Sequence, residues 1–285
     1  MKLIRYGPAG AEQPGLIDGD GVARSLAGHV DDIGPKELAA IFLDTLRAID
    51  PTTLPQVTPQ ARLGVPLAGT RKFIAIGLNY ADHAAESGMA LPAEPIIFTK
   101  AVSCLNGPND PVMIPRDGTK VDWEVELGVV IGDRASGVTE AEALAHVAGY
   151  CVVNDVSERA FQLERGGSWD KGKGCDTFGP VGPWLVTADE IPDPQALDLW
   201  LDVDGQAMQR GNSGTMAFGV AFLVSYVSAF MTLEPGDIIA TGTPPGVGMG
   251  RKPPVFLRPG NVMELSVEGL GRQRQEVIAY RAPSS

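Results

Sequence analysis

Two glutamates in the segment VDWEVELGVVIG, Glu124 and Glu126, have a spacing that suggests chemistry. The segment, residues 121–132, is typical of a β-strand, and residues two apart on a strand point to the same face. Two carboxylates side by side repel each other unless a cation neutralises them. Hard oxygen ligands suit Mg²⁺, Mn²⁺ and, less well here, Ca²⁺ rather than zinc. The pair therefore indicates part of a metal site; the alternative is the solvated face of an edge strand.

A third carboxylate, Asp155, ends the apolar segment YCVVND at residues 150–155. An acidic residue at the end of a buried strand seldom serves solubility alone. If it reached the same cation, three carboxylates would leave coordination positions open for water and substrate. The alternative is a local turn or cap at Asn154 and Asp155.

His83 and Glu86 lie three residues apart in a predicted helix at residues 79–88. On a helix they share a face, so the carboxylate can orient the imidazole and raise its basicity. An incidental ion pair on a surface helix is the alternative. Lys173 lies in the glycine-rich segment WDKGKGCDTFGP, but Lys171 is two residues away, so the pattern leaves open which lysine acts.

The loop TGTPPGVG, residues 241–248, offers hydroxyls and backbone N–H groups that could hold a carboxylate. It is not a phosphate-binding loop of the Walker type, because no GK[ST] follows it, and GVGMG does not match GxGxxG. Neither a GxSxG elbow nor a cysteine-centred nucleophile motif occurs. Nucleotide binding and serine or cysteine nucleophilic catalysis are therefore not expected.

The elements that must position these residues are mostly strands. Strands are predicted at residues 72–77, 93–101, 121–132, 150–155, 237–243 and 262–271, with a hairpin at 197–209 and a helix at 140–150. The strands do not alternate regularly with helices, and 35 Gly and 23 Pro favour many turns. This pattern predicts a β-rich α+β core rather than a doubly wound parallel sheet.

The first 65 residues form a distinct opening segment. They read as a hairpin that turns at residues 18–21, a helix at 38–49 and a loop rich in Pro and Thr. We therefore expect a small N-terminal domain at residues 1–65 and a catalytic domain at residues 66–285.

Charge and cysteine content exclude several classes of partner. The 285 residues carry a formal net charge of −12, which argues against nucleic acid and anionic membrane surfaces. Three cysteines without a CxxC pair argue against a disulfide framework or structural zinc and fit a reducing cytoplasm. The uncharged stretch at residues 218–231 is expected to be a buried core helix rather than a membrane span.

The ordered motifs NYADHAAE, DWEVELGVVIG, VVNDVSERAFQ, KGCDTFGPVGPW and TGTPPGVG resemble the fumarylacetoacetate hydrolase superfamily. The resemblance covers about residues 70–280 and is strongest to the branch of acylpyruvate hydrolases and hydroxyhepta-dienedioate isomerases. It implies a mixed β-sandwich roll with a small N-terminal domain, usually as a homodimer. The chain departs from several members at Leu78, where they carry arginine, which removes one anchor for an anionic substrate group.

By position, the resemblance implies metal ligands Glu124, Glu126 and Asp155, catalytic residues His83, Glu86 and Lys173, and substrate-binding residues Arg159, Gln162 and Thr243. It selects Lys173 over Lys171, and it implies Mg²⁺, with Mn²⁺ common. The activity implied is hydrolysis of a carbon–carbon bond in an acylpyruvate-type 2-oxo acid. Oxaloacetate decarboxylation, isomerisation of 2-hydroxyhepta-2,4-diene-1,7-dioate and, in another class, a non-catalytic metal-stabilised binding protein are the alternatives.

Overall fold

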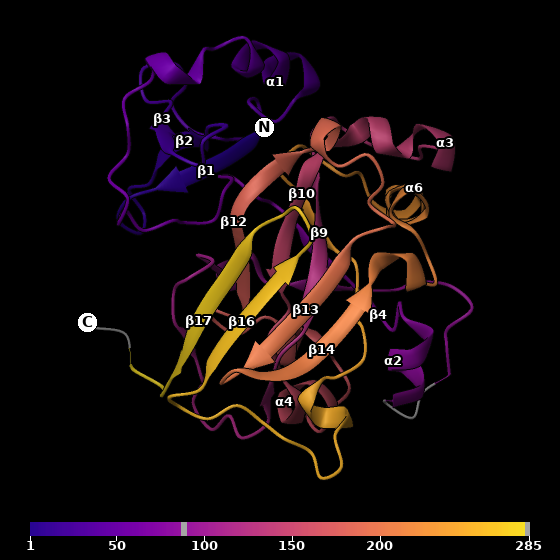
Figure 1. Ribbon diagram of the computed structural model, residues 1–285. Helices are drawn as coiled ribbons and strands as arrows, with labels where there is room; N and C mark the ends of the chain where they lie inside the picture. The colour runs from indigo at the N-terminus through magenta and orange to yellow at the C-terminus, as the bar shows by residue number, and fades with distance from the viewer. Residues whose placement is uncertain (87–89, 283–285) are drawn as a thin grey trace.

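The computed structural model describes residues 1–86 and 90–282, apart from the side chains of residues 83–85. Within these residues the strands form two large β-sheets and one small pair. Figure 1 shows one large sheet lying in front of the other. Strands of the two sheets contact each other through β16 with β9 and β10, and through β17 with β12. The observed fold is therefore the β-rich α+β class that the sequence predicts.

The larger sheet has the strand order β3-β2-β1-β12-β10-β9-β15-β4-β5, with β6 beside β12. Its strands are β1 (Lys2–Tyr6), β2 (Gln13–Ile17), β3 (Ala23–Ser25), β4 (Phe73–Gly77), β5 (Ile96–Lys100), β6 (Leu105–Asn106), β9 (Val125–Ile131), β10 (Val147–Asn154), β12 (Gly179–Thr187) and β15 (Ile238–Ala240). Every residue of the neighbouring strands β9 and β10 is buried. These two strands form the centre of the core.

The second sheet has the order β14-β13-β16-β17-β7, and a short pair joins β8 to β11. These strands are β7 (Val112–Met113), β8 (Val121–Asp122), β11 (Ser157–Glu158), β13 (Asp198–Val203), β14 (Gln206–Asn212), β16 (Val262–Val267) and β17 (Arg272–Ile278). The predicted hairpin is β13–β14, and its turn residues Asp204 and Gly205 have φ of 50° and 74°. This turn matches the strand twist, which favours Asp-Gly here.

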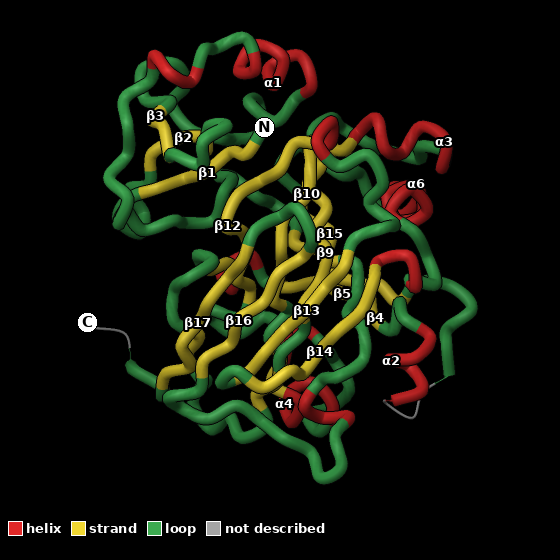
Figure 2. Tube along the Cα trace, in the orientation of Figure 1, coloured by secondary structure: helices red, strands yellow, loops and turns green. Residues whose placement is uncertain are grey.

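The helices are short and lie around the two sheets rather than alternating with the strands (Figure 2). They are α1 (Ala40–Arg47), α2 (Ala81–Glu86), α3 (Glu140–Ala143), α4 (Arg159–Leu163), α5 (Asp170–Lys173) and α6 (Val220–Phe230). Helix α6 is the core helix expected at residues 218–231, with Leu223, Val224 and Val227 buried. In the part of the chain described, none of the helices has the length and apolarity needed to cross a bilayer.

The opening segment shares the larger sheet with the rest of the chain. Strand β1 pairs with β12 through Lys2 opposite Val186 and Leu3 opposite Leu185. The remaining strands of the segment extend the sheet outward as β2 and β3. A division into two domains at residue 65 stays a prediction.

Two predicted elements differ in kind as well as in length from those in the structure. The strand expected at residues 121–132 is divided into β8 and β9, because the backbone N–H groups of residues 123–125 donate to side chains: to Asp122, Asn154 and Gln209, respectively. The helix expected at residues 140–150 ends at Ala143, a 3₁₀ turn follows to His146, and the β-strand begins at Val147. Strand β10, which begins at Val147, pairs with β9 as far as Asn154, so sheet formation overrides the helical pattern there.

Candidate metal centre and active site

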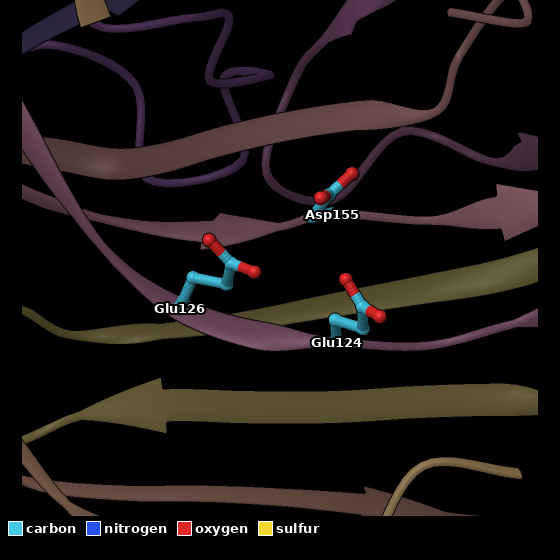
Figure 3. A group of neighbouring side chains, drawn as sticks. All are labelled: Glu124, Glu126 and Asp155. Atoms are coloured by element: carbon cyan, nitrogen blue, oxygen red, sulfur yellow. The ribbon is translucent and has the colours of Figure 1, made fainter. Parts of the chain in front are cut away.

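The pairing of β9 with β10 brings the three predicted metal ligands together. Glu126 lies opposite Val153, and the backbone N–H of Asp155 donates to the carbonyl oxygen of Glu124 at 2.9 Å. One oxygen from each of Glu124, Glu126 and Asp155 lies within 4.8 Å of the others. Figure 3 shows the side chains of Glu124 and Glu126 on the side of their strand that faces Asp155. The alternative of a solvated strand face does not hold, because all three residues are buried.

Lys173 bridges two of these carboxylates. Its Nζ lies 2.5 Å from Oε2 of Glu124 and 2.7 Å from Oδ2 of Asp155. Burial acts to lower the pKa of Lys173, but Asp155 and Glu124 outweigh it and raise the pKa above its ordinary value. The lysine therefore stays charged. Lys171, the competing candidate, donates to the carbonyl oxygen of Arg165 instead.

Arg159 holds the other side of the cluster. Its guanidinium donates from Nη2 to Glu124 at 2.7 Å, from Nε to Asp122 at 2.9 Å and from Nη1 to Oε1 of Gln162 at 3.0 Å. Burial acts against the charge, yet Glu124 and Asp122 raise the pKa of Arg159 above its ordinary value. The predicted substrate-binding pair Arg159 and Gln162 is thus one hydrogen-bonded unit beside the carboxylates.

Two charged residues of this cluster were not predicted. Lys100, whose side chain is 0% exposed, donates to Oδ1 of Asp155 at 2.6 Å and to the carbonyl oxygens of Val156 and Lys173. Asp122 accepts from Arg159 and is also fully buried. The sequence contained a signal for Asp122, since this residue precedes Glu124 by the same two-residue step that separates the glutamates. The signal for Lys100 was weaker: this lysine ends the apolar segment IIFTK.

The donor set fits a hard divalent cation. Burial raises the pKa of Glu126 well above its ordinary value, and the charges of Asp155 and Glu124 raise it further. Counting Asp122, four carboxylates face three cations, so the ionised cluster has one negative charge in excess. Mg²⁺ and Mn²⁺ bind through carboxylate oxygens and water, and they would remove the mutual repulsion of the carboxylates.

The backbone N–H groups of the loop at residues 241–248 donate hydrogen bonds to carboxylates of the protein itself. Gly242 donates to Oε2 of Glu126 at 2.8 Å, Gly246 to Glu86 at 3.0 Å and Gly248 to Asp122 at 2.7 Å. A Cβ at Gly246 would lie 2.0 Å from the carbonyl oxygen of Met208, and its φ is 111°, so glycine is required. The loop therefore fixes acidic side chains from three separate segments.

Thr243, the predicted ligand of a substrate carboxylate, is already hydrogen-bonded to other groups of the protein. Its hydroxyl donates to the carbonyl oxygen of Val125 at 2.8 Å and accepts from Nε2 of Gln209 at 2.7 Å. It still lies on the wall of the pocket above the cluster. A hydrogen bond from Thr243 to substrate would replace the one to Val125.

Helix α2 carries the predicted pair His83 and Glu86. Both carboxylate oxygens of Glu86 accept from the N–H of Gly246, which anchors the end of the helix to the loop at residues 241–248. The side chain of His83 lies outside the described residues. The pairing of His83 with Glu86 stays a prediction.

One pocket gathers most of the predicted site residues on its polar side: Glu124, Glu126, Arg159, Gln162, Lys173 and Thr243. Asp155 is 0% exposed, behind them. The geometry therefore offers, at one end of a pocket, acidic metal ligands with two cations beside them. This arrangement can bind a divalent ion and stabilise negative charge that develops on a bound molecule.

Comparison with known proteins shows the family of the chain. Residues 72–278 match the model of the fumarylacetoacetate (FAA) hydrolase C-terminal family. A Burkholderia lata protein, named only provisionally as a hydrolase, is 61% identical over 96% of this chain and 98% of its own length. The chain belongs to the fumarylacetoacetate hydrolase family, whose enzymes bind a divalent metal.

Two solved structures share the whole fold. The fumarylacetoacetate hydrolase of Exiguobacterium antarcticum has a TM-score of 0.86 and 35% identity, covering 98% of this chain and 100% of that one. The maleylpyruvate hydrolase of a Sphingobium species, solved with manganese(II) and pyruvate, has a TM-score of 0.82 and 28% identity, covering 99% and 100%. These likenesses identify the protein as an enzyme of this family.

Proposed function

We propose that the protein is a hydrolase that depends on Mg²⁺ or Mn²⁺ and cleaves a carbon–carbon bond in an acylpyruvate-type 2-oxo acid. The observation that carries the proposal is the buried cluster of Glu124, Glu126 and Asp155 with Lys173 held against it. The structural relative with manganese(II) and pyruvate supports both the metal class and the oxo-acid product. A merely structural metal site would not need a charged lysine on the pocket side of its ligands.

In the proposed reaction, His83, oriented by Glu86, removes a proton from water. The resulting hydroxide attacks the carbonyl carbon of the acyl group. The bond between that carbon and C3 of the pyruvate half breaks, and its electron pair stays on the pyruvate half as an enolate. Proton transfer to C3 then gives pyruvate, while the acyl group leaves as a carboxylic acid.

Lys173 stabilises the charge that develops in this step. It is buried, protonated and positioned by Glu124 and Asp155, so it need not reorganise when the enolate oxygen becomes negative. A divalent ion held by Glu124, Glu126 and Asp155 would supply further positive charge for binding an oxo acid. Arg159 keeps Glu124 oriented, and Gln162 keeps Arg159 in place.

Replacing His83 by alanine is expected to reduce turnover by about 10²–10⁴-fold, because general-base catalysis is lost. Metal affinity is expected to stay unchanged, since the three carboxylates are intact. The measurement is kcat for pyruvate release together with calorimetric titration of Mn²⁺.

His29→Ala is the matched control, because His29 is exposed and lies in the N-terminal segment. It is expected to behave as the unmodified protein does in both measurements. Turnover of His83→Ala within a factor of three of the unmodified enzyme would exclude His83 as the base.

A substrate panel tests the proposed activity itself. The protein with Mg²⁺ or Mn²⁺ is incubated with acylpyruvates, oxaloacetate and 2-hydroxyhepta-2,4-diene-1,7-dioate, before and after EDTA. Hydrolysis predicts pyruvate and a carboxylic acid in equal amounts. Release of CO₂ from oxaloacetate would indicate the decarboxylase, and rearrangement without cleavage would indicate the isomerase. No conversion of any compound by metal-bound protein would favour a binding protein.

A further inference from the structure

The pocket above the carboxylate cluster has two chemically different ends. The end toward β9 carries the ionised residues described above. The remaining walls include the apolar residues Leu78, Phe98, Leu163, Trp169 and Met249. A substrate whose 2-oxo acid half lies on the ionised end must place its acyl substituent against the apolar walls.

The apolar wall begins directly at the catalytic lysine. Nζ of Lys173 lies 5.3 Å from the ring centroid of Phe98, and Trp169 packs edge-on against Phe98 with a centroid distance of 5.3 Å. The Trp169 ring in turn covers Gly77, where a Cβ would lie 2.5 Å from Cζ3 of the indole. The rings are therefore held in place by backbone and by each other, and they form a fixed surface.

The two cationic side chains of the pocket already pair with carboxylates of the protein. Arg159 donates to Asp122, Glu124 and Gln162, and Lys173 donates to Glu124 and Asp155. Among the described residues that line the pocket, these two are the only lysines and arginines. Neither has a charge free of a protein carboxylate that could pair with a second anionic group at the apolar end.

The chain between the two pocket-lining positions Gly77 and Phe98 adds no permanent positive charge. Residues 77–99 contain no lysine or arginine, and they contain three acidic residues, Asp82, Glu86 and Glu94. A carboxylate buried without a cationic partner loses its hydration and gains nothing in return. An apolar group placed there gains from leaving water.

We propose that the site selects 2-oxo acids with an uncharged, apolar acyl substituent, a short branched alkyl or an aryl group, and discriminates against dicarboxylates. The inference rests on the proposed acylpyruvate hydrolase function and specifies its substrate class. It distinguishes this chain from its structural relative named for maleylpyruvate, a substrate with a second carboxylate.

A matched pair of compounds tests the selection. Isocaproylpyruvate and succinylpyruvate have the same number of non-hydrogen atoms, and they differ in whether the acyl chain ends in an isopropyl group or a carboxylate. With Mn²⁺ bound, kcat/KM for pyruvate release is expected to favour isocaproylpyruvate by about 100-fold or more. Equal values, or a preference for succinylpyruvate, would overturn the inference.

A variant at the rim of the pocket tests whether the lack of a free positive charge causes the discrimination against dicarboxylates. Leu163, the last residue of α4, is 45% exposed, so an arginine there is compatible with folding and suits a helix C-terminus. Leu163→Arg is expected to raise kcat/KM for succinylpyruvate at least about 10-fold relative to isocaproylpyruvate. Leu163→Gln, polar but uncharged, is expected to keep the original order of the two substrates.

Binding separates failure of the inference from failure of the proposed function. Calorimetric titration of both compounds into the Mn²⁺-loaded protein measures affinity without turnover. Tighter binding of isocaproylpyruvate with no pyruvate from either compound would support the selection and overturn the hydrolase. Pyruvate release that favours succinylpyruvate would support the hydrolase and overturn the selection. Equal affinity without turnover would overturn both.

Discussion

Replacing Glu126 by glutamine is expected to abolish metal binding and to reduce turnover by more than about 100-fold. Changes outside the ligand shell of a metal already cost ~10–100-fold in affinity or activity, so the loss of a direct ligand should exceed that. The glutamine oxygen can still accept the hydrogen bond that Gly242 donates to Glu126. The loop at residues 241–248 is therefore expected to stay in place, and the effect should be confined to the ion.

The same variant is expected to separate the stability of the metal-free protein from the stability gained by binding metal. Without metal, Glu126→Gln should be at least as stable as the unmodified protein, because it removes one of three like charges that repel one another in a buried cluster. With metal at about one hundred times its dissociation constant, the unmodified protein gains about 2.7 kcal/mol from binding and the variant gains nothing. Thermal unfolding with and without Mn²⁺ measures both quantities.

Glu276→Gln provides the control, since Glu276 is exposed on β17 and the charge change is the same. It should show the full metal-dependent rise in melting temperature. If Glu126→Gln kept that rise, Glu126 would not be a metal ligand, and the centre would have to be assigned to other residues.

The clustering of the three carboxylates could be predicted because it follows local rules. Glu124 and Glu126 share a face through the two-residue repeat of extended chain, and Asp155 marks the end of a buried strand. Their convergence needs only that two strands of one sheet be neighbours, which β9 and β10 are. The fold class followed from the same kind of signal, the excess of short strands.

Features that depend on long-range contacts could not be predicted in this way. The pairing of β1 with β12 joins residues more than 180 positions apart, and no local pattern encodes it. Strand β17 was missed because its inward residues include Gln273 and Gln275, which look exposed in sequence. Both are buried and donate to backbone oxygens, Gln273 to Val152 and Gln275 to Pro108. Gln275 also donates to Oε1 of Gln273, but their other partners lie far away in sequence.

The role of Lys100 was hidden for the same reason. A lysine at the end of a strand usually reaches solvent, so its sequence position suggests a surface residue. In the structure, its ammonium joins Asp155 to the backbone at Val156 and Lys173. It therefore connects Asp155 with the helix that ends at Lys173, and only the folded chain brings these three segments together.

Replacing Lys100 by methionine is expected to lower the free energy of unfolding of the metal-free protein by about 3–5 kcal/mol, because it breaks a buried ion pair and leaves two cations instead of three facing four buried carboxylates. Methionine keeps most of the aliphatic chain, so the loss measures charge and hydrogen bonds rather than volume. Lys120→Met is the control, since Lys120 and its partner Glu164 are 40% and 57% exposed. Such a surface pair contributes about 0–1 kcal/mol.

A double-variant cycle identifies the carboxylate on which Lys100 acts. If Lys100 serves to compensate Asp155, Asp155→Asn should restore part of the stability that Lys100→Met loses, because one of the excess negative charges is then gone. If Lys100 only ties Val156 and Lys173 together, the losses of the two substitutions should add. Urea unfolding of the four proteins without metal distinguishes these results. Additive losses would show that Lys100 stabilises the backbone at Val156 and Lys173 and does not act by compensating the charge of Asp155.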